Sequence, residues 1–172
     1  MCMKKLVCTA DVCSLVFGTV FAVLYGIFRS GICFSLAVTF FTAFYHITMR
    51  LVTGYAVNHI KAEKKPFKIS AAEMRFYKII KLRNWKGKVP TYKKEMFSFE
   101  KNSYDEIYRN MANAQTGHEI MVLLSFVPLL LSKALDGFVP FLVTSVLAAM
   151  FDMQFVFVQR YNRARLSKII YN

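Results

Sequence analysis

A histidine and a carboxylate at the start of an apolar run are the first candidates for chemistry in this chain. His118 and Glu119 stand side by side where a long polar segment gives way to the apolar run 120–131. Imidazole is the side chain most often used as a general base, and a neighbouring carboxylate can orient it. We therefore predict His118 as a catalytic base oriented by Glu119. His46, inside an earlier apolar run, is the alternative base.

A second group of candidates lies near the C-terminus, where three arginines fall within the segment 159–165. Guanidinium groups bind phosphate oxygens through paired hydrogen bonds. The segment therefore predicts a phosphate or headgroup site, and Asn162 within it is a candidate hydrogen-bond donor to an oxyanion. The alternative is a basic cluster that only marks the cytoplasmic end of a membrane span. The predicted ligands are Gln159, Arg160, Arg163 and Arg165.

The single tryptophan defines a third candidate region. Trp85 is followed by Lys86 and Lys88, and the stretch closes on Pro90. Lysines beside a tryptophan either anchor a chain at the membrane interface or grip an anionic headgroup or phosphate. Trp85, Lys86 and Lys88 are therefore candidates for substrate binding, with the interfacial anchor as the alternative.

Four apolar runs must position these residues. The chain has 172 residues, of which 56% are hydrophobic, against about 45–50% in ordinary soluble domains. A helix needs about 20 residues to cross the hydrocarbon core of a bilayer. We expect spans at about 6–28, 32–57, 119–135 and 138–158, the third being either a short span or a re-entrant helix. Short turns pair them into two hairpins, so the predicted fold is an all-α integral membrane protein with one domain, 1–172.

The first run also resembles a secretory signal peptide in its position after two lysines. Its length, the interruption at Asp11 and the lack of a small-residue cleavage site before the second run favour an uncleaved span instead.

Basic residues lie on one side of this topology. Lysine and arginine number 23 against 10 acidic residues, a net charge of +13. Of the 23, 21 fall before the first span, at the end of the second, in the middle segment 58–118 or after the fourth. Positive residues concentrate in cytoplasmic loops, so we expect a multi-pass cell-membrane protein with both termini and the middle segment cytoplasmic. The chain carries no nucleic-acid-binding motif and no metal-ligand spacing among its cysteines, so neither partner is expected.

Two amphipathic helices are predicted in the middle segment, over 69–82 and from 102 or 103 to about 119. Ser70 and Ser103 are each followed three residues later by a glutamate. This spacing is typical of a capping box, in which the serine and the glutamate bond each other's backbone N–H groups. The second helix is expected to continue directly into the third span.

Polar residues inside the predicted spans allow two interpretations. In the second span they follow helical spacing and form one stripe, which serves either interhelical hydrogen bonding or a functional site. The stripe comprises Thr39, Thr42, His46, Arg50 and Thr53. In the fourth span, Asp152 is predicted to pair with a basic residue of the bundle, and Arg50 is one candidate.

Three strings together resemble the glycosyl-4,4'-diaponeurosporenoate acyltransferase family. They are Trp85-Lys86-x-Lys88-x-Pro90, His118-Glu119 opening an apolar run, and the Q-R-Y-N-R-x-R string at 159–165. The resemblance covers about 74–166. That family comprises small bacterial membrane proteins, and its named activity esterifies a fatty acyl group onto the sugar of a glycosylated carotenoid acid. The family commonly has Glu where this chain has Gln115.

The resemblance implies a membrane acyltransferase of carotenoid biosynthesis. It would move a fatty acyl group from an acyl thioester donor to a hydroxyl of a glycosylated isoprenoid or other glycolipid. Membrane lipid would be a further partner, and no cofactor is expected. The chain lacks a G-x-S-x-G nucleophile elbow and a convincing cysteine nucleophile, which favours direct transfer. The alternative, favoured by Gln115, is a non-catalytic membrane scaffold or lipid-binding subunit.

Overall fold

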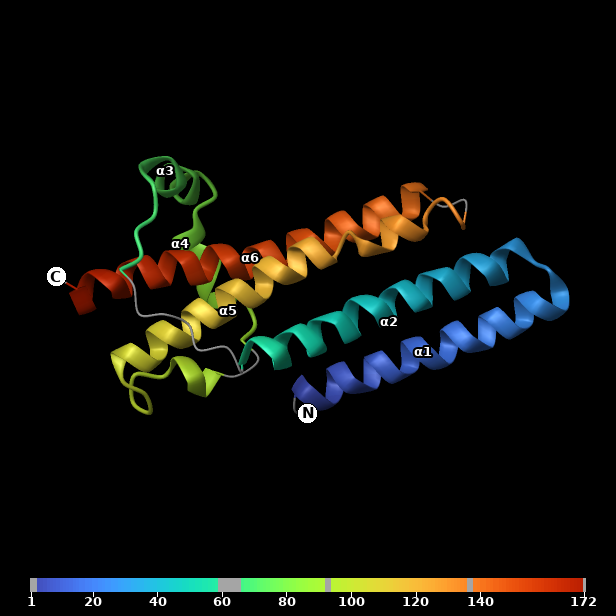
Figure 1. The fold of residues 1–172 in the computed structure, drawn as a ribbon, viewed down its shortest axis with the longest axis horizontal. Helices are drawn as coiled ribbons and strands as arrows, with labels where there is room; N and C mark the ends of the chain where they lie inside the picture. Colours follow the sequence, from blue (N-terminus) through green and yellow to red (C-terminus); the bar gives the residue numbers. More distant parts are fainter. Residues whose placement is uncertain (1–2, 59–65, 92–93, 136–137, 172) are drawn as a thin grey trace. The chain divides into compact units, whose positions relative to one another are not determined.

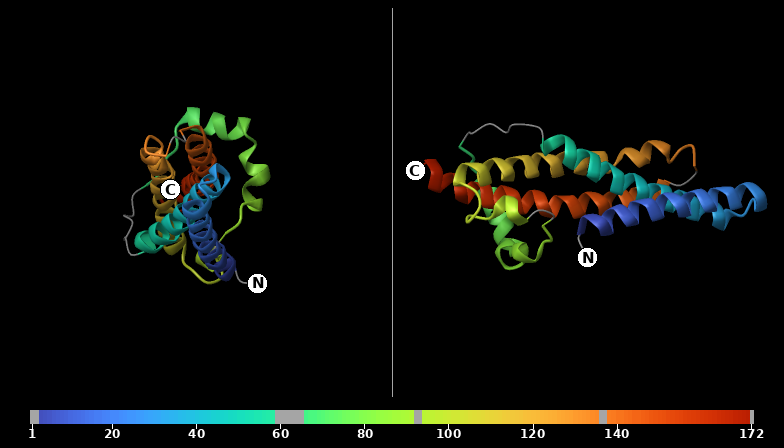
Figure 2. Two further views of the ribbon diagram at one scale, coloured as in Figure 1. Left: turned by 90° about the vertical axis from the view of Figure 1, so that its right-hand side faces the viewer. Right: turned by 90° about the horizontal axis from the view of Figure 1, so that it is seen from below.

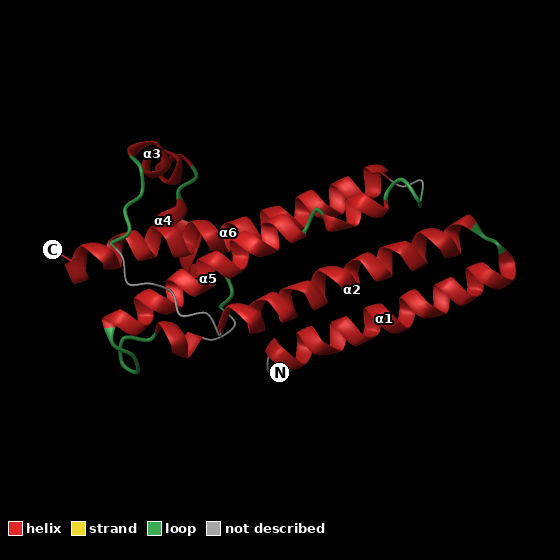
Figure 3. Ribbon diagram, viewed as in Figure 1, coloured by secondary structure: helices red, strands yellow, loops and turns green. Residues whose placement is uncertain are grey.

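The computed structural model describes residues 3–58, 66–91, 94–135 and 138–171, and within them it contains helices and connecting loops but no strand (Figure 3). This confirms the all-α prediction. The α-helices and the short 3-10 helices, labelled η, follow one another as α1 (Met3–Phe28), α2 (Gly31–Asn58), α3 (Ala71–Ile79), α4 (Leu82–Trp85), η1 (Lys86–Lys88), η2 (Lys94–Phe97), α5 (Tyr104–Leu124), η3 (Val127–Leu131) and α6 (Phe138–Tyr171).

Four segments are long enough and apolar enough to cross a membrane, as the sequence predicts. They are Lys5–Phe28, Gly31–Val57, Tyr104–Leu131 and Phe138–Tyr171. The first two match the predicted spans closely, and the other two are longer than predicted. The predicted turn at 136–137 lies outside the described residues, as do residues 59–65 of the predicted middle segment.

The third and fourth segments are extended by polar helical turns. The amphipathic helix expected from 102 or 103 runs without a break into the apolar residues after 119 as α5, and η3 continues it to Leu131. Helix α6 has 34 residues, about 51 Å at 1.5 Å per residue, whereas the hydrocarbon core is about 30 Å thick. The last turns of α6, which carry its arginines, therefore extend beyond an apolar layer that begins near Phe138.

The chain divides into two compact units, Met1–Val52 and Thr53–Asn172. The single-domain expectation stays a prediction, and each unit is described by itself. The first unit is a helical hairpin of α1 and most of α2 (Figure 1). The hydroxyl of Thr48 donates to the two carboxylate oxygens of Asp11 at 3.1 and 3.2 Å. A Cβ added at Gly18 would lie 3.1 Å from the Phe41 ring, so the small residue permits this close approach.

In the second unit, α5 and α6 lie side by side in both views of Figure 2. Ile107, Tyr108 and Met111 of α5 are buried against Leu166 of α6, with Phe67 packed beside them. This apolar cluster fixes how the two helices face each other toward the C-terminal end of α6. Residues of α5 that follow this cluster and residues of α6 that precede it therefore face each other along the same helix–helix contact.

The short helices α3 and α4 pack against the side of α6. Tyr77 and Leu82 are buried with Val158, and the partly buried Trp85 and Tyr161 surround them. The indole N–H of Trp85 also donates to the carbonyl oxygen of Ile80 at 2.9 Å. Trp85 therefore holds the turn between α3 and α4 in place.

Both predicted serine caps are present. Ser103 accepts a hydrogen bond from the Glu106 N–H, and the Glu106 carboxylate accepts from the Ser103 N–H at 2.8 Å, completing a capping box at the start of α5. Ser70 caps α3 by accepting from the Glu73 N–H at 3.1 Å. At α3 the carboxylate of Glu73 contacts Arg160 of α6 instead of the Ser70 backbone N–H, and this contact forms part of the candidate site.

Candidate functional site

The centre of the site is a hydrogen bond between α5 and α6. His118 Nδ1 lies 3.1 Å from Asp152 Oδ1. The Asp152 side chain is completely buried, and that of His118 is 24% exposed. A buried carboxylate is costly unless it is paired and hydrogen-bonded, so Asp152 favours the imidazole tautomer that donates from Nδ1. The sequence predicted a basic partner for Asp152 within the bundle, and His118 is a residue of that kind.

The imidazole ring is also held by stacking. His118 lies parallel to Phe155 of α6, with ring centroids 4.4 Å apart and an interplanar angle of 9°. Among the described residues, His118 Nε2 has no hydrogen-bond partner, while the side chain retains some exposure. When Nδ1 donates to Asp152, the lone pair is on Nε2. The imidazole of His118 is therefore held in one orientation, with the lone pair of Nε2 available to accept a proton.

Glu119 lies in a different network from His118. Its Oε1 accepts a hydrogen bond from the Gln115 Nε2 at 2.9 Å and lies 3.7 Å from Arg160 Nη1. The carboxylate that contacts His118 is thus Asp152 rather than the sequence neighbour Glu119. On one helix, successive residues point about 100° apart, which explains why adjacency in sequence does not bring Glu119 onto the imidazole.

Gln115 bridges two charged groups. Besides donating to Glu119, it accepts a hydrogen bond from Arg163 Nη1 through Oε1 at 3.3 Å. Gln115 is 5% exposed. An amide can donate and accept at once, whereas a carboxylate in this position could not donate to Glu119. The glutamine is therefore chemically suited to this place between Glu119 and Arg163.

Arg160 connects α6 to α3. Its Nε and Nη2 donate to the two carboxylate oxygens of Glu73 at 2.8 and 3.0 Å, a bidentate pair. Tyr77 also donates to Glu73 through its hydroxyl. The hydrogen bond from Arg160 lowers the pKa of the Glu73 carboxyl and outweighs the opposing effect of burial. The pKa of the Tyr77 hydroxyl is raised, mainly by burial and second by its hydrogen bond to Glu73.

Arg163 is enclosed by aromatic rings. Its guanidinium carbon lies 4.4 Å from the Phe67 ring centroid and 5.0 Å from that of Tyr108. The buried Oε1 of Gln159, one turn earlier on α6, has no hydrogen-bond partner among the described residues. Of the predicted phosphate ligands on α6, Arg160 and Arg163 thus already contact carboxylate, amide or aromatic groups.

The tryptophan–lysine region meets another side of α6. Lys86 donates to the side-chain amide oxygen of Asn162, Oδ1, at 2.7 Å, and its Nζ lies 5.0 Å from the Tyr161 ring centroid. The guanidinium of Arg165 lies 5.9 Å from the same ring. Lys88 is exposed in η1. The structure therefore gathers Lys86, Asn162 and Arg165 around Tyr161, separately from the hydrogen bond of His118 with Asp152.

His46, the alternative base, lies in the first unit. It is 8% exposed, and its carbonyl oxygen accepts a hydrogen bond from Arg50 Nη1 at 2.8 Å. Its use as a base stays a prediction, as do the roles assigned to the other candidate residues. Within the described ranges, no group of three or more histidine, cysteine, aspartate or glutamate side chains is placed to hold a metal ion.

Sequence reasoning missed Glu73 as a site residue and gave Asp152 only a pairing role. Glu73 carried a capping signal, and that local signal concealed the bond to Arg160, 87 residues away. For Asp152, the available signal was a carboxylate at predicted membrane depth, where an ionisable side chain is costly and commonly functional.

Together, fold and site define a helical protein of the multi-pass membrane type, with a histidine–carboxylate pair between two of its long helices. The chain belongs to the glycosyl-4,4'-diaponeurosporenoate acyltransferase family, whose family model matches residues 55–172. This confirms the family predicted from the sequence strings. The matched region includes α3 to α6 and every residue of the networks around His118 and Arg160. No curated protein and no solved structure matches the chain.

Proposed function

We propose that this protein is a membrane acyltransferase that moves a fatty acyl group to a hydroxyl of a glycosylated isoprenoid or another glycolipid. Family membership supports this class of reaction. The observation that carries the proposal is the bond of His118 to the fully buried Asp152 at 3.1 Å. An acyl transfer to a hydroxyl needs a base for the hydroxyl proton, and an imidazole held by a carboxylate is suited to that role.

The proposed reaction uses an acyl thioester as donor and no cofactor. His118 Nε2 takes the proton of the acceptor hydroxyl while that oxygen attacks the thioester carbonyl carbon. The tetrahedral intermediate then expels the thiolate as the C–S bond breaks. The imidazolium returns its proton to the thiolate, so the products are an ester and a free thiol. Asp152 orients the ring and stabilises the imidazolium that forms in between.

Neighbouring groups are proposed to bind and position the substrates. Asn162 and the basic residues Lys86, Lys88 and Arg165 lie on or beside the polar end of α6, where the headgroup of a lipid substrate would meet the protein. We place this end, the segment 58–118 and both chain termini on the cytoplasmic side, because positive residues concentrate there. The partners are then membrane lipid, the acyl donor and the glycosylated lipid acceptor.

The proposal is tested with purified protein in lipid nanodiscs. Palmitoyl coenzyme A and glycosyl-4,4'-diaponeurosporenoate are supplied, and the acylated product is measured by mass spectrometry. We expect product with the wild type and a loss of about 10²- to 10⁴-fold with His118→Gln, the usual contribution of a general base. A His118→Gln protein as active as the wild type would overturn the assignment of the base.

The non-catalytic alternative predicts a different cellular result. If the chain is only a scaffold or a lipid-binding subunit, cells lacking it keep their acylated glycolipids, or regain them with His118→Gln as fully as with the wild type. If the chain is the enzyme, the acylated lipid disappears in the deletion strain and returns with the wild type but not with His118→Gln. Lipid extracts of these strains distinguish the two functions.

A further inference from the structure

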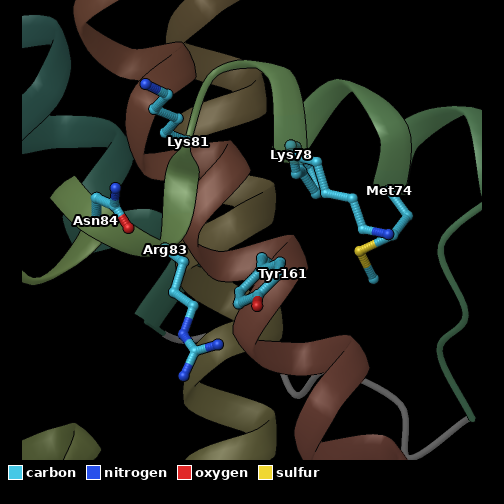
Figure 4. A pocket seen from close by; sticks show the side chains of 7 residues that line it. Met74, Lys78, Lys81, Arg83, Asn84 and Tyr161 are labelled. Carbon is cyan, nitrogen blue, oxygen red and sulfur yellow. The ribbon is translucent and has the colours of Figure 1, made fainter.

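A cavity of about 310 Å³ lies where α3, α4 and α6 meet, apart from the His118–Asp152 bond (Figure 4). Ligand pockets in proteins range from about 300 to 1,000 Å³, so this space suits a compact ligand or one part of a larger ligand. Its lining residues are Met74, Tyr77, Lys78, Lys81, Arg83, Asn84 and Tyr161. We call it the basic pocket.

Three cations and no carboxylate line the basic pocket. The side chains of Lys78, Lys81 and Arg83 are exposed, and none of them forms an ion pair with a carboxylate of the described residues. Arg160, by contrast, is held in a bidentate pair by Glu73. The positive charge that remains available to an anion is therefore concentrated at the basic pocket rather than at Arg160.

Further positive charge lies beside the pocket. Burial lowers the pKa of Lys86, and the charges of Arg165 and Arg83 lower it further. Like charges near one another raise the local affinity for an anion. The pocket also has polar and aromatic partners for a ligand, since Asn84 can donate hydrogen bonds and Tyr161 presents a ring from α6 (Figure 4).

The backbone at the pocket adopts a rare conformation. Lys81, between α3 and α4, has φ 50° and ψ 41°, in the left-handed region that a lysine seldom occupies. Strained conformations of this kind cluster at ligand sites. This turn separates α3 from α4, and Lys78 and Arg83 on its two sides line the same cavity.

We propose that the basic pocket binds the phosphate groups of the acyl donor, and that the donor is a thioester carried on a nucleotide phosphate. The assignment of the ligand as donor rests on the proposed function. The binding chemistry itself does not, because three cations in a cavity of this size recognise a phosphate whatever reaction follows. The site lies on residues other than the arginines of 159–165.

The binding test uses adenosine 3',5'-bisphosphate as the probe, with the purified wild-type protein in phosphatidylcholine nanodiscs and isothermal titration calorimetry. We compare the double variant Lys78→Gln/Arg83→Gln with Arg75→Gln/Lys68→Gln. The control pair removes the same charge from exposed positions that do not line the pocket. We expect the pocket variant to weaken binding about 10- to 100-fold, the effect of losing two charge-assisted contacts, and the control less than threefold.

A charge-retaining variant serves as the control for misfolding of the pocket variant. Lys78→Arg/Arg83→Lys is expected to keep binding within about fivefold of the wild type, because both cations remain. Equal weakening by the pocket and control variants would overturn the proposal, and so would the absence of binding to the wild type.

A lipid headgroup is the other source of a phosphate at this site. If the bisphosphate does not bind, but phosphatidylglycerol mixed into a second set of nanodiscs co-purifies with the wild type and not with Lys78→Gln/Arg83→Gln, the assignment to the donor is wrong. Nucleotide binding without acyl transfer would instead contradict the proposed function while leaving the pocket intact. Acyl transfer that is unaffected by Lys78→Gln/Arg83→Gln at limiting donor would contradict the pocket alone.

Discussion

At the scale of single residues, the proposed mechanism depends on where protons and charges are held. Asp152 has no exposure in the middle of α6, and it faces an imidazole that is itself stacked on a ring. Leaving the buried carboxylate without this hydrogen-bond partner costs about 1–3 kcal/mol or more. The pair is therefore structural as well as a candidate for catalysis, and a test of function must separate the two by measuring folding alongside activity.

Gln115 is expected to stabilise the site by serving two partners. Gln115→Leu keeps a similar volume but removes the donor to Glu119 and the acceptor for Arg163. We expect unfolding to become easier by about 1–3 kcal/mol, the usual cost of leaving buried polar partners unsatisfied. The measurement is thermal unfolding in detergent, with the exposed Gln154→Leu as a matched control on α6. Equal melting temperatures for Gln115→Leu and the wild type would contradict this role.

Glu73 is expected to stabilise the protein in a pH-dependent way. Its pKa is lowered in the folded state by Arg160, so the stabilisation is complete above the pKa of the unfolded chain and is lost as pH falls through the lower folded-state pKa. Glu73→Gln should therefore cost about 1–2 kcal/mol near pH 7 and much less near pH 3.

The measurement for Glu73 is the difference in melting temperature between wild type and variant at the two pH values. Glu100→Gln, at an exposed position, serves as the control. A difference between wild type and Glu73→Gln that grows toward acid pH would contradict the ion pair with Arg160.

At the scale of secondary-structure elements, the helix starts position the site. The capping box at Ser103 fixes where α5 begins, and α5 carries Gln115, His118 and Glu119 in its later turns. Ser103→Ala should destabilise the protein by about 1 kcal/mol, as for other N-cap serines. Thermal unfolding measures this, and Ser98→Ala in the preceding loop is the control. If both substitutions lower the melting temperature equally, the cap at Ser103 has no special part.

Whether an interaction could be predicted from the sequence depends on how far apart along the chain its two residues lie. The caps at Ser70 and Ser103 depend on residues three positions apart, so local spacing predicted them. The bond of His118 to Asp152 depends on how α5 and α6 are rotated against each other, which the buried cluster around Tyr108 and Leu166 determines. Local sequence carries little information on that rotation, and the adjacent Glu119 was therefore the natural but incomplete choice.

The carboxylate of Glu73 also binds a partner that is distant in the sequence. A glutamate three residues after Ser70 predicts a capping box, yet its carboxylate bonds Arg160 on α6 instead. A charged bidentate contact is stronger than a hydrogen bond to a backbone N–H. The competing partner is 87 residues away, so no window along the sequence contains both groups.

At the scale of the whole molecule, topology is the open prediction. Four segments can cross a membrane, and 21 of the 23 basic residues lie on one side of the predicted arrangement. A single introduced cysteine, in a chain whose own cysteines are replaced by serine, reports the side of each loop. A membrane-impermeant maleimide should label Ser30→Cys in intact cells and label Lys68→Cys or Lys168→Cys only after lysis. The reverse pattern would contradict a cytoplasmic middle segment and C-terminus.

The proposed mechanism requires that His118, held by Asp152, is the base for acyl transfer. The most direct measurement is the rate of acyl transfer by purified Asp152→Asn in nanodiscs, compared with wild-type protein of equal folded fraction. The asparagine keeps the shape of the carboxylate but removes its charge and favours the wrong imidazole tautomer. We expect a kcat lowered by about 10²- to 10⁴-fold with little change in KM. A folded Asp152→Asn protein with a wild-type kcat would contradict it.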